Sequence, residues 1–203
     1  MGKKVLWVHS SCKVFDDSLS TQVGYHLFTK LREQLEANGE EIELMERDTT
    51  YLPHIDGATL TAAYSDPEEY EATLSHTLVQ EVKTADYILI SLPMYNFSIP
   101  SSLKAWIDHI VIKNQTFGYV DGKPSALVAH KPCVINIASG GAYAANSPYD
   151  QITKYLTMVL GFIGILHPTI LWSSGTGQKP LEENFAATKE HVTPESVMKM
   201  FEL

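Results

Sequence analysis

Residues 85–108, ADYILISLPMYNFSIPSSLKAWID, contain a strand, a loop and a helix in direct succession, and this succession decides the fold class. The apolar run ADYILISLP is typical of a strand that is buried on both faces. Apolar residues then recur at helical spacing and predict a helix with one buried stripe, formed by Leu103, Trp106, Ile107, Ile110 and Val111. The loop between them, residues 93–100, is too apolar for an idle surface turn, which indicates that it faces something other than water.

The alternation of strand and helix extends in both directions along the chain. Four more strands are predicted at KKVLWVHS, EEIELMERD, PCVINIASGG and GILHPTILWSSG. Four more helices are predicted at residues 19–35 (ended by Asn38 and Gly39), 67–82, 148–162 and 181–192. Residues 49–66 are expected to be irregular, Asp121 and Gly122 to turn a small β-hairpin, and the last residues to form a short tail.

Five strands that alternate with helices predict an α/β fold, a parallel sheet with helices on both faces. We expect one domain that spans residues 1–203. In a doubly wound sheet of order 2-1-3-4-5, ligands bind at the carboxyl ends of the strands, where the order reverses between strands 1 and 3. Three loops belong at that edge, residues 10–20, 93–100 and 138–147, so the sequence predicts one ligand site that they share.

Composition excludes several classes of function. The chain has a formal net charge of -9 and no basic stripe, so a general nucleic-acid binder is not expected. No apolar run is long enough to span a membrane. The two cysteines, Cys12 and Cys133, form neither a disulfide framework nor a zinc-ligand spacing, which fits a reduced, cytoplasmic protein without a metal site.

The first loop offers hydroxyl groups ahead of a helix N-terminus, a place where free N–H groups favour a phosphate. These hydroxyls belong to Ser10, Ser11, Ser18, Ser20 and Thr21. The loop has neither the G-x-G-x-x-G of a dinucleotide site nor the G-K-[ST] of a P-loop. Serines also cap most helices, so phosphate binding and simple capping are equally compatible with this loop.

The third loop contains Gly140 and Gly141, and paired glycines let a backbone approach a flat ligand closely. A tight turn would explain the same pair. A tyrosine phosphatase of low molecular weight would need Cys-x5-Arg in the first loop, but Ser18 stands where the arginine belongs after Cys12. Without a guanidinium nothing would clamp a phosphoryl group or lower the pKa of the thiol, so we expect Cys12 to be a packing or incidental thiol.

The stretch PMYNFSIPSSLKAWID closely resembles the FMN-dependent NADH azoreductases, also called FMN-dependent NADH:quinone oxidoreductases. Shorter pieces along the chain are similar to the same family: SS after the first strand, LPHIDG, TFGY, SGG and LGFIGI. The resemblance implies a flavodoxin-like three-layer sandwich around a five-stranded parallel sheet. It also implies non-covalent FMN, NADH as co-substrate and a homodimer.

The family's site residues carry over to matching positions of this sequence. For the phosphate of FMN, the matches are Ser11, Ser18, Leu19 and Ser20. For the isoalloxazine ring, they are Met94, Tyr95, Asn96 and Phe97, with Ala138, Ser139, Gly140 and Gly141 along its pyrimidine side. For the acceptor cavity, they are Phe97, Phe117 and Phe162, the last two from the partner subunit.

The sequence departs from the family in two loops. The family often has S-R-G-G in the third loop, whereas this chain has Ala138 to Gly141 without a cation, and the first loop adds Lys13 and the acidic pair Asp16 and Asp17. Carboxylates beside a phosphate are unfavourable unless they point outward.

The mechanism that the resemblance implies is a ping-pong cycle. NADH passes a hydride to N5 of the flavin and leaves, and a quinone or azo compound then takes the same place and receives two electrons. No catalytic side chain is needed, because the flavin carries the chemistry. Two alternatives are a flavodoxin-type electron carrier, in which the aromatic residues Phe117 and Phe162 would be wasted, and a flavin-free interaction protein on the same fold.

Overall fold

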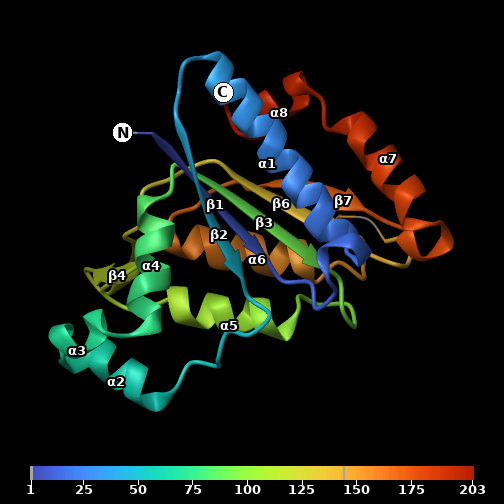
Figure 1. Ribbon diagram of the computed structural model, residues 1–203. Coiled ribbons are helices and arrows are strands. Elements are labelled where there is room, and N and C mark those ends of the chain that lie inside the picture. The colour runs from blue at the N-terminus through green and yellow to red at the C-terminus, as the bar shows by residue number, and fades with distance from the viewer. Residues whose placement is uncertain (1, 144) are drawn as a thin grey trace.

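A twisted parallel sheet forms the centre of the protein in the computed structural model, which describes residues 2–143 and 145–203 (Figure 1). Its five strands lie in the order β2-β1-β3-β6-β7, and each pair of neighbours is parallel. Their bounds are β1 Lys3–His9, β2 Ile42–Asp48, β3 Tyr87–Pro93, β6 Cys133–Ala138 and β7 Thr169–Ser173. The predicted strand order and parallel direction are confirmed.

Helices cover both faces of this sheet (Figure 1). One face is covered by α1 Leu19–Ala37, α7 Leu181–His191 and α8 Pro194–Met200. The other is covered by α4 Leu74–Thr84, α5 Ser101–Ile110 and α6 Ile152–Ile163. Together with the sheet, these two groups make the three layers expected for a flavodoxin-like protein.

The two hydrophobic cores follow from the alternation of side chains along the strands. In β1, Val5 and Trp7 pack in the core beneath α1, while Leu6 and Val8 pack in the core on the opposite face. All four side chains are at least 98% buried. Strands with both faces covered are therefore apolar at every position rather than at alternate ones.

A glycine inside α1 allows this helix to lie close to the sheet. A Cβ at Gly24 would overlap with Ser91 Oγ and would lie 2.8 Å from Trp7 Nε1. Those two side chains form a buried hydrogen bond of 3.0 Å, donated by the indole N–H of Trp7 to Ser91. The close contact fixes the height of α1 above the sheet and with it the position of the loop that precedes the helix.

Between β2 and β3 the sequence prediction is wrong in two places. Residues 49–66 are not wholly irregular, because α2 Gly57–Ser65 begins where the Asp56 carboxylate accepts the N–H of Thr59. The helix predicted from Pro67 is broken into α3 Pro67–Glu71 and α4. Thr73 causes the break, since its side chain accepts the N–H of His76 and starts a new helix.

Two further boundaries differ near the C-terminal half. The helix predicted from Pro148 begins at Ile152, because the Asp150 carboxylate accepts the N–H of Thr153 in its first turn. The predicted tail contains α8, which starts with a reciprocal pair of hydrogen bonds between Thr193 and Ser196.

The predicted hairpin is confirmed. Strands β4 Phe117–Val120 and β5 Lys123–Ala126 pair antiparallel, apart from the main sheet. Asp121 and Gly122 connect them with positive φ angles of 51° and 74°, the geometry of a two-residue hairpin turn. Two short 3-10 helices complete the elements: η1 Phe15–Asp17 leads into α1, and η2 Thr176–Gln178 follows β7.

Candidate functional site

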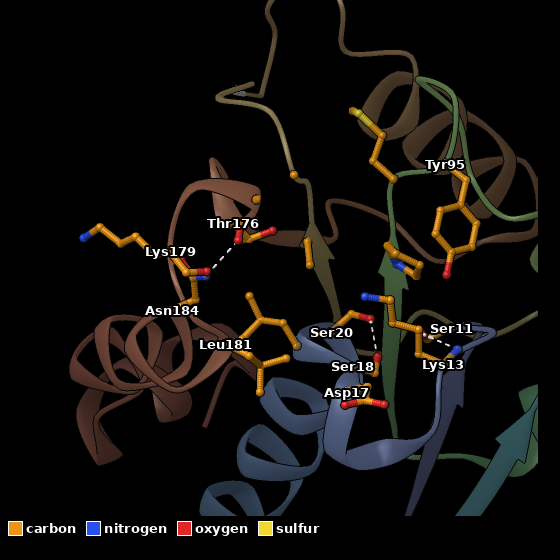
Figure 2. A pocket seen from close by; sticks show the side chains of 16 residues that line it. Ser11, Lys13, Asp17, Ser18, Ser20, Tyr95, Thr176, Lys179, Leu181 and Asn184 are labelled. Carbon is orange, nitrogen blue, oxygen red and sulfur yellow. Dashed lines mark hydrogen bonds between the residues drawn. The ribbon is translucent and has the colours of Figure 1, made fainter.

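A cavity of about 380 Å³ lies at the carboxyl ends of β1, β3 and β6 (Figure 2). The three predicted loops meet there, as expected for the point where the strand order reverses. Among the residues predicted to bind the cofactor, those that line the cavity are Ser11, Ser18, Leu19, Ser20, Met94, Tyr95, Ala138 and Gly140. The predicted residues that do not line it are Asn96, Phe97, Ser139, Gly141, Phe117 and Phe162.

The first wall of the cavity is the start of α1. Ser18 caps this helix, since its Oγ accepts the N–H of Thr21 at 3.3 Å, and it also contacts the hydroxyls of Ser20 and Thr21 at 3.3 and 2.8 Å. The first N–H groups of a helix have no partner within it. Ser18 accepts the N–H of Thr21, and in the described part of the chain the N–H groups of Leu19 and Ser20 have no acceptor, so they remain available at the cavity. Capping and an anion-binding arrangement thus occur together in one turn.

A buried asparagine ties this turn to the centre of the sheet. The side-chain amide of Asn136, in β6, donates a 2.7 Å hydrogen bond to the carbonyl of Ser20. Asn136 is fully buried, and its Oδ1 has no partner among the described residues. The sequence analysis missed this residue. A polar side chain within an otherwise apolar strand was the signal that could have identified it.

The second wall is the loop after β3, and main-chain hydrogen bonds hold it. The N–H of Met94 donates to Ala138 at 2.8 Å, while Tyr95 and Ser98 exchange hydrogen bonds of 3.1 and 3.0 Å. At the tip, Asn96 and Phe97 both have positive φ, 49° and 64°. Two successive non-glycine residues in this region are strained, and such strain concentrates at functional sites.

The tip of this loop lies outside the cavity. Phe97 is 47% exposed, and its ring packs against those of Tyr143 and Tyr149, with centroids 5.5 and 6.0 Å apart. Both tyrosines belong to the loop after β6. Phe97 therefore contributes to an exposed aromatic group beside the cavity instead of to the cavity itself.

Tyr95 lines the cavity and contacts the first loop. Its hydroxyl is hydrogen-bonded to the thiol of Cys12 at 3.0 Å. Burial raises the pKa of Tyr95 above its ordinary value, and the hydrogen bond with Cys12 raises it further. Tyr95 is thus a neutral hydroxyl at physiological pH. Cys12 is exposed, and it contacts the site through Tyr95.

The third wall is the loop after β6. Ser139 is buried, and its hydroxyl accepts the indole N–H of Trp172 at 2.8 Å and donates to the carbonyl of Gly141 at 3.1 Å. Its side chain is therefore fully used in shaping the loop. Gly140 remains open to the cavity, because a Cβ there would have only one neighbour within 4 Å, Gly177 N at 4.0 Å.

A fourth wall was missed by the sequence analysis. It is the segment after β7, which contributes Thr176, Gly177, Lys179, Leu181 and Asn184. Gly177 donates a hydrogen bond of 3.0 Å to Gly140, and the amide of Asn184 donates to the carbonyl of Thr176 at 2.9 Å (Figure 2). The glycine-rich run after the last strand was the available signal, since β7 ends at the same edge of the sheet.

Phe117 and Phe162 lie elsewhere. Their rings pack against each other with centroids 4.7 Å apart, one in β4 and the other in α6. Phe162 is 38% exposed. Within a single chain these two rings contact each other and not the cavity.

In residues 2–143 and 145–203, the side chains of His, Cys, Asp and Glu form no group of three that could hold a metal ion. Over the same residues, none of the helices has the length and apolar character needed to cross a bilayer.

Comparison with known proteins gives a consistent result. A family model described as the flavodoxin-like fold matches residues 3–193. The FMN-dependent NADH:quinone oxidoreductase of Herminiimonas arsenicoxydans is 41% identical over 196 residues, covering 92% of this chain and 94% of that protein. The FMN-dependent NADH:quinone oxidoreductase 2 of Bradyrhizobium diazoefficiens is 35% identical over 181 residues, with coverage of 85% and 87%.

A solved structure agrees in shape as well. It is the crystal structure of an FMN-dependent NADH-azoreductase from Bacillus anthracis in complex with FMN, with a TM-score of 0.80 and 25% identity. The alignment covers 99% of this chain and 100% of that chain. On these grounds the chain belongs to the family of flavodoxin-like oxidoreductases that includes the FMN-dependent NADH:quinone oxidoreductases.

Proposed function

We propose that this protein is a homodimeric enzyme that uses NADH and non-covalently bound FMN to reduce quinones and azo compounds by two electrons. The relatives in Herminiimonas and Bradyrhizobium are named as NADH:quinone oxidoreductases, and the Bacillus anthracis structure is named as an NADH-azoreductase. The observation that carries the proposal is the cavity at the switch point of the sheet, which is lined by serine hydroxyls and by the apolar residues Met94 and Ala138.

The cavity fits FMN in volume and in chemistry. Its volume of about 380 Å³ lies within the range of small-molecule sites, roughly 300–1,000 Å³. At one end, the hydroxyls of Ser18 and Ser20 and the open N–H groups of α1 suit a phosphate. At the other, Met94 and Gly140 offer an apolar side chain and a bare backbone to a planar ring.

The main chain supplies hydrogen-bond donors for the ring. The N–H groups of Met94 and Tyr95 are already taken by Ala138 and Ser98. Within the described part of the chain, those of Asn96, Phe97, Gly140 and Gly141 have no acceptor. Because Gly140 is the one of these four residues that lines the cavity, we assign its N–H group to a heteroatom of the ring. Donors fixed in place stabilise the negative charge that reduction leaves there.

FMN, when bound, supplies a ring that accepts a hydride from NADH and passes two electrons to the acceptor. The protein's part is to position the cofactor and to admit both substrates in turn to the same place. No side chain needs to act as a nucleophile or a general acid. The exposed side chain of Phe97 from one subunit, with half-buried Phe117 and exposed Phe162 from its partner, would cover that place and select planar acceptors.

The test is a steady-state assay of the purified, FMN-loaded protein. The proposal expects a yellow protein that oxidises NADH rapidly only when a soluble quinone or an azo dye is present. Reciprocal plots at several acceptor concentrations should be parallel, as a ping-pong cycle requires. Bound flavin with negligible NADH turnover would instead indicate an electron carrier. A colourless protein that takes up no flavin would indicate an interaction protein.

A further inference from the structure

Two lysines, Lys13 and Lys179, line the cavity, and their side chains point in different directions. Figure 2 shows the side chain of Lys13 extended into the cavity toward the side that carries Ser18 and Ser20. In the same view the side chain of Lys179 points away from the cavity. Only one of the two ammonium groups is thus presented to a ligand.

The main chain at Lys13 is held in place while its ammonium group is free. The N–H of Lys13 donates a 3.2 Å hydrogen bond to Ser11 Oγ, which shapes the loop. Lys30 and Lys104, in contrast, pair with Glu33 and Asp108 at 2.7 and 2.6 Å. Among the residues that the structure describes, Lys13 Nζ has neither a carboxylate within ion-pair distance nor a hydrogen-bond acceptor.

The negative charges near the start of α1 would make a cation there favourable for binding a phosphate. The chain carries a net charge of -9, and Asp16 and Asp17 stand directly before α1. Asp17 lines the same cavity. A phosphate at the start of α1 would be repelled by these carboxylates, and helix N–H groups carry only partial charges. A full positive charge at Lys13, which lines the same cavity, offsets the repulsion.

We propose that Lys13 is the counter-ion of the FMN phosphate in this protein and binds the dianion together with the hydroxyls of Ser18 and Ser20. This inference rests on the proposed function. It assigns to Lys13 a role at the phosphate and none at the ring. A cation at the phosphate discriminates FMN from riboflavin, which has the same ring without the phosphate, whereas a cation at the ring would act on both.

The test measures the dissociation constants of FMN and riboflavin with the flavin-free protein, by quenching of flavin fluorescence. Lys13→Met is expected to weaken FMN binding about ten- to hundredfold, the range that a hydrogen bond to a charged group contributes, and to leave riboflavin binding unchanged. Lys13→Arg should keep most of the preference for FMN. Lys179→Met is the matched control: it removes the same charge from the cavity rim and should leave the preference unchanged.

Three results would contradict the assignment. If Lys13→Met weakened the binding of FMN and of riboflavin equally, Lys13 would act on the ring that both flavins share and not on the phosphate. If the wild-type protein prefers FMN and Lys13→Met keeps that preference, the role of Lys13 is refuted while the proposed function stands. A wild-type protein that binds neither flavin would overturn the proposed function, and the assignment with it.

Discussion

The side-chain amide of Asn136 donates a hydrogen bond of 2.7 Å to the carbonyl of Ser20 and so fastens the first turn of α1 to a central strand. Both residues are almost completely buried. The serine that lines the cavity is therefore positioned from beneath by a side chain that does not itself line the cavity. This hydrogen bond connects the start of α1 directly to the middle of the sheet.

Changing Asn136 should weaken both the fold and the site. Asn136→Leu removes the donor and should lower the free energy of unfolding by about 1–3 kcal/mol, because the Ser20 carbonyl loses a buried partner. Asn136→Asp should be worse, since it turns a buried carboxylate toward that carbonyl. Chemical denaturation and FMN titration measure the two effects. An aspartate variant that is as stable as the leucine variant would contradict the proposed geometry.

Gly24→Ala should destabilise the protein although alanine is the better helix former. The added Cβ would overlap with Ser91 Oγ and crowd Trp7, which overpacks the contact between α1 and the sheet at a cost of about 1–3 kcal/mol. Gly57→Ala is the control, because a Cβ at this position in α2 meets nothing within 4 Å. Thermal unfolding should show a loss of stability for the first variant and none for the second.

Asp150 should make stability depend on pH. Burial raises the pKa of this carboxyl, but the hydrogen bonds from Thr153 and from the N–H of Asn146 lower the pKa more, so that it ends below its ordinary value. The unfolded chain then binds the proton first as the pH falls. The stabilisation is fully present above about pH 4 and is lost as the pH falls through the folded pKa.

Asp150→Asn isolates this contribution. The difference in unfolding free energy between wild type and variant should be constant near neutral pH and should shrink below about pH 4. Urea denaturation at a series of pH values measures it. A difference that stays the same down to pH 3 would mean that Asp150 does not hold a lowered pKa.

Phe97→Ala should alter acceptor selectivity more than flavin retention, since Phe97 lies outside the cavity and packs on Tyr143 and Tyr149. The aromatic contact is worth about 0.5–1.5 kcal/mol, so the ratio of kcat/KM between a quinone and an azo dye should change roughly two- to tenfold. Tyr51→Ala, at a 92% exposed residue, is the control. Loss of FMN with an unchanged acceptor preference would argue against this division of roles.

The proposed dimer can be tested at Phe162. Phe162→Glu places a charge on an exposed aromatic surface and should convert a dimer into a monomer in sedimentation velocity experiments. Met198→Glu is a matched control on α8, because Met198 and Phe162 are 36% and 38% exposed. A wild-type protein that sediments as a monomer would refute the dimer. A dimer unaffected by Phe162→Glu would place the interface elsewhere.

The sheet could be predicted from the sequence because its central strands β1, β3 and β6 are buried on both faces and are mostly apolar, while the edge strand β2 alternates. Helix boundaries were harder. Leu74, Leu78 and Val82 continue the helical spacing after Pro67, and nothing in that spacing reveals that Thr73 turns its side chain to start a new helix. At the C-terminus the signal was present, since Thr193 followed by Pro194 is a common helix start.

The three loops that form most of the cavity could be predicted from sequence patterns. The first three loops carry hydroxyl, aromatic or glycine patterns that indicate a ligand. The wall from Thr176 to Asn184 offers only a short glycine run as a signal, and the pairing of β7 with β6 brings it to the cavity. Asn136 stood out as a polar residue in an apolar strand, but its partner, the Ser20 carbonyl in α1, could not be predicted from its neighbours along the chain.

The segment after β7 follows an edge strand of the sheet, whereas the start of α1 is hydrogen-bonded to the central strand β6 through Asn136. Mutations therefore meet different constraints at the two ends of the cavity. Gly175, Thr176 and Gly177 are hydrogen-bonded to the loop after β6, so we expect change to be tolerated beyond them, at Lys179, more readily than at the start of α1. New substrate ranges should accordingly evolve along this outer rim, with the cofactor's anchorage inherited unchanged.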